Sequence, residues 1–175
     1  MKRSLLKEIV IIICISVFLG FTMNFISPNK IPLVQDYSSR YLVDSTASDK
    51  QKPVRQYTKE GFVKPVNVKV QDVKKMFDEG VVFIDGRPPE EYAAGHIKGA
   101  VNIPYKEFKD KTTEQKLEVL KAYDKEKPLV SYCGGGDCEI SIDNAYEMAK
   151  AGYNELKIYL GGYKEWEELG YPVEK

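Results

Sequence analysis

The sequence predicts an α/β fold in which helices cover both faces of a mostly parallel central sheet, preceded by an N-terminal transmembrane helix. Short apolar runs alternate with amphipathic segments after residue 66. Some of these runs are apolar at every position, as in strands buried on both faces. An uncharged apolar stretch occupies residues 9–26. With 175 residues, the chain has room for one domain plus appendages.

The N-terminal stretch has the features of an uncleaved membrane anchor. Residues 1–8 are basic, and residues 9–26 are about as short as a bilayer-spanning helix can be. No small-residue cleavage site follows, which disfavours a cleaved signal peptide; a buried helix of the domain is the remaining alternative. Because the positive residues come first, we expect a single pass through the inner (cell) membrane, with the domain facing the periplasm or cell exterior.

The next segment, residues 27–66, carries prolines, serines and charges without a sustained period. It reads as an extracytoplasmic linker, or equally as an ordered arm on the domain surface. The domain itself is assigned to residues 67–175. The chain has 26 basic and 26 acidic residues, so nothing in its charge indicates a nucleic-acid partner.

Within the domain, local patterns predict the elements in order. Val70, Val73 and Phe77 have helical spacing, and Gly80 ends that helix. Next come a strand at 81–84, a short helix from Pro88 ended by Gly95, and a strand at 100–104. A helix capped by Thr112 and Gln115 follows, with Leu117, Leu120 and Tyr123 inward. The remaining elements are a strand at 129–130, a helix with Ile142, Ala145 and Ala149 inward, a strand at 158–160 and a last helix through Trp166.

The candidate nucleophile is Cys133, which directly follows the strand at 129–130. In such folds ligands bind at the carboxyl ends of the strands. Cys133 is followed by Gly134, Gly135 and Gly136 and then by a helix. Backbone amides in a glycine loop and the N-terminus of a helix both stabilise an anionic sulfur. The alternative is an inert buried cysteine beside a glycine turn.

Four separated motifs occur in order along the domain. They are Asp-x-Arg at Asp85 and Arg87, the run PEEYAAGHIKGA ending at Ala100, the strand–cysteine–loop–helix unit at Cys133, and Gly-Gly-x-x-x-Trp ending at Trp166. Together they resemble the rhodanese family of sulfurtransferases over about residues 68–174. The resemblance implies a rhodanese-like three-layer fold. It also implies a persulfide on Cys133, formed from a small sulfur donor and passed to a thiophilic acceptor such as a protein thiol.

The resemblance also assigns the supporting residues. The expected substrate-binding positions are Gly134, Gly135, Gly136, Asp137 and Cys138. Asp85, Arg87, Glu91 and His96 are expected to be structural support, with Arg87 paired to a carboxylate such as Glu91 and His96 bonded to a turn. The Gly161-Gly162 turn and Trp166 are expected to pack. No cofactor is implied, and two thiols with one histidine fall short of a structural zinc site.

The loop departs from the family in its charge. None of the five residues after Cys133 is Arg or Lys, the usual cation for gripping an anionic donor. Asp137 and Glu139 are expected to oppose a dianion such as thiosulfate. Glu139 also stands where phosphatases and arsenate reductases of related fold carry an arginine, which argues against that enzyme class.

Cys138 leaves the function open. A C-x4-C pair in an oxidising compartment can close into a disulfide, Cys138 can resolve a persulfide on Cys133, or it can pack as a small apolar residue. The alternatives to a sulfurtransferase are therefore an extracytoplasmic thiol-disulfide protein using both cysteines, and a non-catalytic rhodanese-like binding module.

Overall fold

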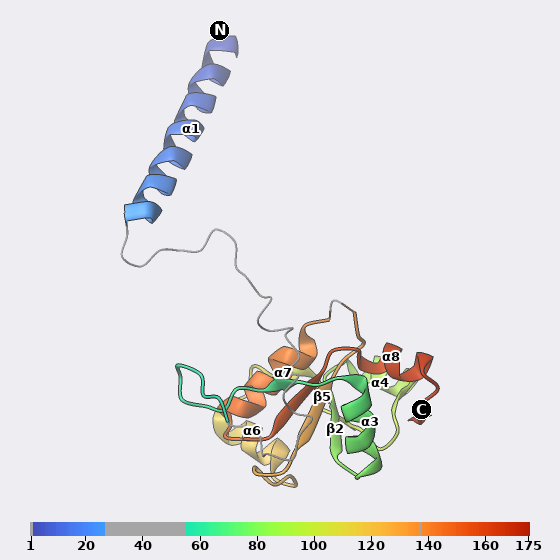
Figure 1. The fold of residues 1–175 in the computed structure, drawn as a ribbon. Coiled ribbons are helices and arrows are strands. Elements are labelled where there is room, and N and C mark those ends of the chain that lie inside the picture. The colour runs from blue at the N-terminus through green and yellow to red at the C-terminus, as the bar shows by residue number, and fades with distance from the viewer. Residues whose placement is uncertain (1, 27–54, 137) are drawn as a thin grey trace. The chain divides into compact units, whose positions relative to one another are not determined.

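The computed structural model describes residues 2–26, 55–136 and 138–175 (Figure 1). The chain divides into two compact units, residues 1–37 and 38–175. The described part of the first unit is one helix, α1 (Lys2–Ile26). The predicted transmembrane helix at 9–26 is not found, because no helix in the part of the chain that the structure describes is long and apolar enough to cross a membrane. Of the predicted linker or arm, residues 27–54 lie outside the described residues.

The second unit is built on a parallel sheet of five strands in the order β1-β6-β5-β2-β4, as predicted. β5 lies at the centre of the sheet and is buried at every position. A separate antiparallel pair joins β3 to β7. The strands are β1 (Val66–Asn67), β2 (Val82–Asp85), β3 (His96–Ile97), β4 (Val101–Asn102), β5 (Leu129–Tyr132), β6 (Leu156–Tyr159) and β7 (Val173–Glu174).

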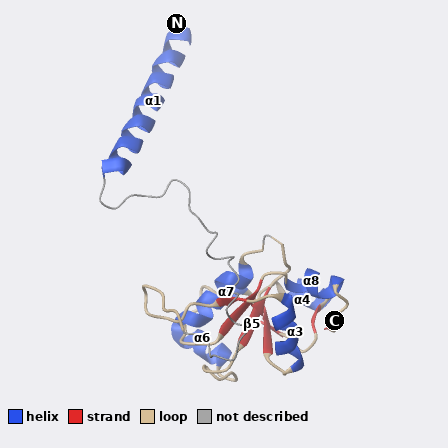
Figure 2. Ribbon diagram, in the orientation of Figure 1, coloured by secondary structure: helices blue, strands red, loops and turns tan. Residues whose placement is uncertain are grey.

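Helices lie on both sides of the sheet, with α6 and α7 on one side and α3 and α8 on the other (Figures 1 and 2). This is the three-layer arrangement that the alternating pattern predicts. Beyond α1, the helices are α3 (Val70–Asp78), α4 (Pro89–Ala94), α5 (Tyr105–Phe108), α6 (Thr113–Leu120), α7 (Ile140–Lys150) and α8 (Gly162–Glu168).

Each face of the sheet has its own apolar core. Successive residues of a strand point to opposite faces, so adjacent residues of β2 enter different cores. Phe83 packs in the core that contains Val73 of α3 and Trp166 of α8. Its neighbour Ile84 packs in the core that contains Ile142 of α7. Burial on both faces explains why β2 and β5 begin with consecutive apolar residues.

The capping box predicted at Thr112 is present, since its side chain accepts from the amide of Gln115 and the Gln115 side chain accepts from the amide of Thr112. The helix it opens is shorter than predicted. α6 ends at Leu120, and Tyr123 packs against the core from the turn that follows.

The described end of the predicted linker or arm packs on the domain. Arg55 forms ion pairs with Glu126 at 2.6 Å and with Glu155 at 3.0 Å. Tyr57 pairs with Val63 in an isolated antiparallel bridge, and Val63 is buried. Residues 55–66 therefore form an ordered arm that leads directly into β1.

Candidate functional site

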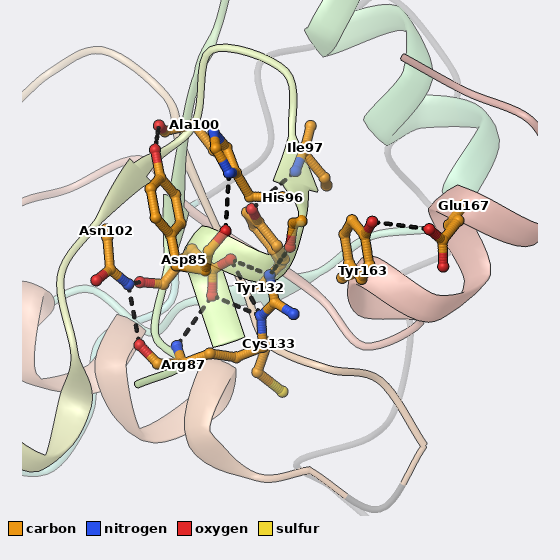
Figure 3. A network of polar contacts seen from close by, with 12 residues as sticks. Asp85, Arg87, His96, Ile97, Ala100, Asn102, Tyr132, Cys133, Tyr163 and Glu167 are labelled. Carbon is orange, nitrogen blue, oxygen red and sulfur yellow. Dashed lines mark hydrogen bonds and ion pairs between the residues drawn. The ribbon is translucent and has the colours of Figure 1, made fainter. Parts of the chain in front are cut away.

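Cys133 lies at the carboxyl edge of the sheet, directly after Tyr132, the last residue of the central strand β5. It is fully buried. Figure 3 shows its side chain pointing away from the polar network around Asp85 and Arg87, toward the loop that follows. The predicted position of the nucleophile, at a strand end and before a loop, is thus the position that the structure has.

The backbone of the glycine loop is shaped for close approach. Gly135 has φ +100°, and a side chain there would also overlap the carbonyl oxygen of Gly161. Among the described residues, the amides of Gly134, Gly135 and Gly136 donate no backbone hydrogen bond. Backbone amides that converge in a glycine turn can form a concave anion site, which holds a thiolate or the outer sulfur of a persulfide.

The turn that opens α8 supports this loop. The amide of Tyr163 donates a 2.8 Å hydrogen bond to the carbonyl of Cys133, and the amide of Lys164 donates a 3.0 Å bond to the carbonyl of Gly134. Gly162 is buried, and a side chain on it would stand 2.5 Å from the amide nitrogen of Gly135. The Gly161-Gly162 turn, expected only to pack, therefore positions the backbone of Cys133.

Cys133 and Cys138 form a disulfide in this structure. The Cα atoms are 6.6 Å apart, within the usual range for a disulfide, and the Cys133 sulfur lies 3.2 Å from the carbonyl oxygen of Cys138. One of the possibilities left open for Cys138 is thus the state observed. A bonded sulfur is no nucleophile, so Cys133 must be reduced before it can attack a donor.

The acidic positions of the loop are described only in part. Asp137 lies outside the described residues, so its predicted repulsion of an anionic donor stays a prediction. Glu139 is the N-cap residue of α7 but makes no side-chain capping bond. The helix starts at Ile140, so the whole bridged loop separates its first turn from Cys133 along the chain.

Arg87 pairs with a carboxylate, as expected, but the residue is Asp85 and not Glu91. Arg87 pairs with Asp85, donating from Nη2 at 2.7 Å and from Nε at 3.1 Å, and it also donates to the carbonyl of Gly95 at 2.7 Å. Glu91 is exposed. Because only Gly86 separates Asp85 from Arg87 at the turn after β2, the backbone amide of Arg87 bonds the same carboxylate. Burial lowers the pKa of Arg87, but the bonds to Asp85 outweigh it and raise the pKa.

The same network contains Tyr132 and His96 (Figure 3). The Tyr132 hydroxyl accepts a 3.1 Å hydrogen bond from the amide of Ile97, and burial together with the charge of Asp85 raises its pKa. His96 bonds the carbonyl of Tyr92 at 2.9 Å through Nδ1, as expected for a residue that fixes a turn. The hydrogen bonds of Tyr132 and His96 fix the chain segments next to Cys133. Neither of these bonds is made to the Cys133 sulfur.

A lysine side chain begins beside the loop that was expected to lack a cation. Lys164 of α8 is exposed, and its Cβ stands 3.6 Å from where a side chain on Gly135 would begin. Sequence reasoning missed it because Lys164 is far from Cys133 along the chain. Lys164 could have been found from its position just after the Gly161-Gly162 turn, because the fold packs that turn against the cysteine loop.

Comparison with known proteins agrees with this architecture. The family model described as a rhodanese-like domain matches residues 69–169. The chain is 30% identical over 109 residues to thiosulfate:glutathione sulfurtransferase of Saccharomyces cerevisiae, covering 57% of this chain and 76% of that protein. It is 37% identical over 95 residues to the HTH-type transcriptional regulator Rv0324 of Mycobacterium tuberculosis. That match covers 54% of this chain and only 38% of the regulator.

Solved structures share the fold. The crystal structure of the BH2092 protein from Bacillus halodurans is similar with a TM-score of 0.52 and 25% sequence identity. The similarity covers 63% of this chain and 75% of that one.

Proposed function

Because the chain belongs to the rhodanese-like domain family, whose members include sulfurtransferases, we propose that it is a sulfurtransferase with Cys133 as its nucleophile. The reduced Cys133 thiolate attacks the outer sulfur of a small sulfane-sulfur donor and keeps that sulfur as a persulfide. A thiophilic acceptor, such as a protein thiol, then removes it.

One observation carries this proposal. Cys133 ends the central strand and enters a loop in which, among the described residues, three consecutive glycine amides donate no backbone hydrogen bond. Amides around a cysteine stabilise its thiolate, and the thiolate is the reactive form. The same amides are placed by the chain order to cradle the added sulfur. We assign substrate contact to Gly134, Gly135 and Gly136.

The test is the mass of the intact full chain after reduction, removal of reductant, and exposure to either thiosulfate or inorganic polysulfide. We expect samples taken early in the exposure to have gained one sulfur atom that a thiol removes. Cys133→Ser should abolish the gain, whereas Cys14→Ser should retain it because Cys14 is a free cysteine outside this loop. A sulfur that stays on the Cys133→Ser protein and maps to Cys138 contradicts the assignment.

The Cys133–Cys138 disulfide favours a second candidate, a thiol-disulfide protein that oxidises or reduces other thiols. Such a protein cycles its own disulfide but gains no sulfur from thiosulfate or polysulfide. The same mass measurement therefore separates the two. A reduced chain that returns to the disulfide on contact with an oxidised dithiol, and never carries added sulfur, supports the second candidate.

A further inference from the structure

The disulfide joins the proposed nucleophile to a second thiol of its own loop. With the Cα atoms 6.6 Å apart, the two side chains reach one another from the backbone positions seen here. A thiolate on Cys138 is therefore within reach of any S–S bond that Cys133 carries. An acceptor for the persulfide is already present inside the loop.

The two cysteines differ in how exposed they are to solvent. Cys133 is fully buried in the bridged state, whereas Cys138 is partly exposed. The carbonyl groups of Cys133 and Gly134 are held by the amides of Tyr163 and Lys164, which fixes the nucleophile's side of the loop. A bulky outside thiol thus meets Cys138 first, and Cys133 is reached most directly by Cys138.

Building on the proposed function, we propose that Cys138 resolves the persulfide on Cys133, so that the protein reduces sulfane sulfur to sulfide. The Cys138 thiolate attacks the inner sulfur of the persulfide, which is the Cys133 Sγ. The bond between the two sulfurs of the persulfide breaks, and the outer sulfur leaves as hydrosulfide with the bonding electron pair. The bond between Cys133 and Cys138 forms. The sulfane sulfur gains two electrons, and the cysteine pair loses them.

The observed disulfide is the end state of that half-reaction, and a dithiol reductant resets it. One thiolate of the reductant attacks the sulfur of Cys138, the less buried of the two cysteines, and Cys133 leaves as a thiolate. The second thiol of the reductant then frees Cys138, and the reductant departs as its own disulfide. A monothiol is less effective, because its mixed disulfide with Cys138 stays beside the Cys133 thiolate, which re-forms the bridge.

The test uses the reduced full chain, freed of reductant and kept without oxygen, with excess thiosulfate as the donor. Thiosulfate leaves sulfite as its other product, so any sulfide comes from sulfur held by the protein. We expect one sulfide per wild-type chain and a mass lower by two hydrogen atoms. Cys138→Ser, and in parallel Cys138→Ala, should instead hold a stable persulfide and release no sulfide until a thiol is added. Cys14→Ser should behave as wild type.

The outcomes separate the two proposals. If the Cys138 variants carry no added sulfur, the proposed sulfurtransferase function fails on this donor and the resolving step fails with it. If the variants carry a persulfide and the wild-type chain also keeps one without releasing sulfide, the function stands and the resolving step is overturned. A wild-type disulfide that forms without sulfide likewise overturns it.

A second measurement tests the reset under turnover. Sulfide production by the wild-type chain should be faster with dithiothreitol than with glutathione at equal thiol concentration. The Cys138→Ser protein has no disulfide for the reductant to reopen. The ratio of its sulfide rate with dithiothreitol to its rate with glutathione should therefore fall toward the ratio of the uncatalysed reactions. An unchanged ratio in the variant contradicts the role of Cys138.

Discussion

The amide of Tyr163 donates a 2.8 Å hydrogen bond to the carbonyl oxygen of Cys133, joining the first turn of α8 to the end of β5. The two residues belong to motifs separated by the whole of α7 and β6. Their contact explains why a Gly-Gly turn precedes α8, since Gly162 lies directly against the backbone of the cysteine loop. The α8 turn is thus part of the nucleophile's support.

Gly162→Ala should slow persulfide loading by up to about 100-fold, because a reacting group displaced by about 1 Å can lose that much rate. Gly162 has φ +62°, and a methyl group there would overlap the carbonyl of Cys133 and press on the amide of Gly135. The loop must move to accommodate it. The time course of sulfur gain by intact mass, starting from reduced protein, measures the effect.

Gly170→Ala is the matched control. Gly170 has a similar φ of +69°, but nothing stands within 4 Å of a side chain there. Both variants pay the backbone strain of an alanine at positive φ, about 1–3 kcal/mol. Only Gly162→Ala reaches the loop. Equal loading rates for the two variants would show that the α8 turn does not position Cys133.

The order of the elements could be predicted from the sequence because it rests on local patterns. Each local signal concerns only its own segment; examples are the apolar run of β2, the capping box at Thr112 and the glycine past α7. The parallel sheet follows from the alternation of strands and helices along the chain. The short strands β1, β3 and β7 are only two residues long, so no period could reveal them. No helix among the described residues is long and apolar enough to cross a membrane, so the predicted anchor was not found there, and the extracytoplasmic location drawn from it stays a prediction.

The site was predicted where it depends on sequence neighbours and missed where it depends on the fold. Cys133 and its glycines are adjacent in the chain, and the Cys138 bridge was one of the alternatives considered. The pairing of Arg87 with Asp85 instead of Glu91 is set by the turn after β2, which the family resemblance alone did not indicate. Lys164 reaches the loop only because α8 folds back against it.

Asp85→Asn should lower the free energy of unfolding by about 3–5 kcal/mol, since it leaves a buried guanidinium without its counter-charge. Asp85 is fully buried, and the Arg87 side chain is 7% exposed. Urea unfolding of the variants measures the loss. Glu91→Gln is the control and should change stability by less than about 0.5 kcal/mol, because Glu91 is exposed. A loss as large for Glu91→Gln would restore the pairing first expected.

Glu147→Gln should lower the free energy of unfolding by about 3 kcal/mol at pH 7. Lys116, on α6, is buried and forms an ion pair with Glu147, which also pairs with Lys150 at 2.6 Å. Burial raises the pKa of Glu147, but the bonds from Lys116 and Lys150 outweigh it and lower the pKa below its usual 4.5. The stabilisation is therefore present above that value and is lost as the pH falls through the lowered pKa.

The difference between wild type and Glu147→Gln should accordingly shrink as unfolding is followed from neutral pH down through pH 4.5 and below. Glu118→Gln removes the same kind of group from a pair whose two side chains are each 69% exposed. That control should change stability by no more than about 1 kcal/mol at any of these pH values. If the loss of unfolding free energy in Glu147→Gln instead grows as the pH falls, the pH dependence has the opposite sign and the assigned cause is contradicted.

Lys164→Gln should raise the KM for thiosulfate by about fivefold, since a unit charge about 4 Å from an anion contributes about 1 kcal/mol in water. The change removes the cation that α8 places beside Gly135, and kcat should stay nearly constant if Lys164 acts in binding alone. Initial rates measured in the presence of a dithiol reductant give both constants.

The control is Lys127→Gln, which removes the same charge from an exposed position near the start of β5, at the opposite edge of the sheet. This variant should leave the KM unchanged. Added salt should raise the wild-type KM and narrow the gap to Lys164→Gln, because mobile ions screen an exposed charge. If both lysine variants shift the KM equally, the effect comes from the net charge of the protein and Lys164 has no special place in donor binding.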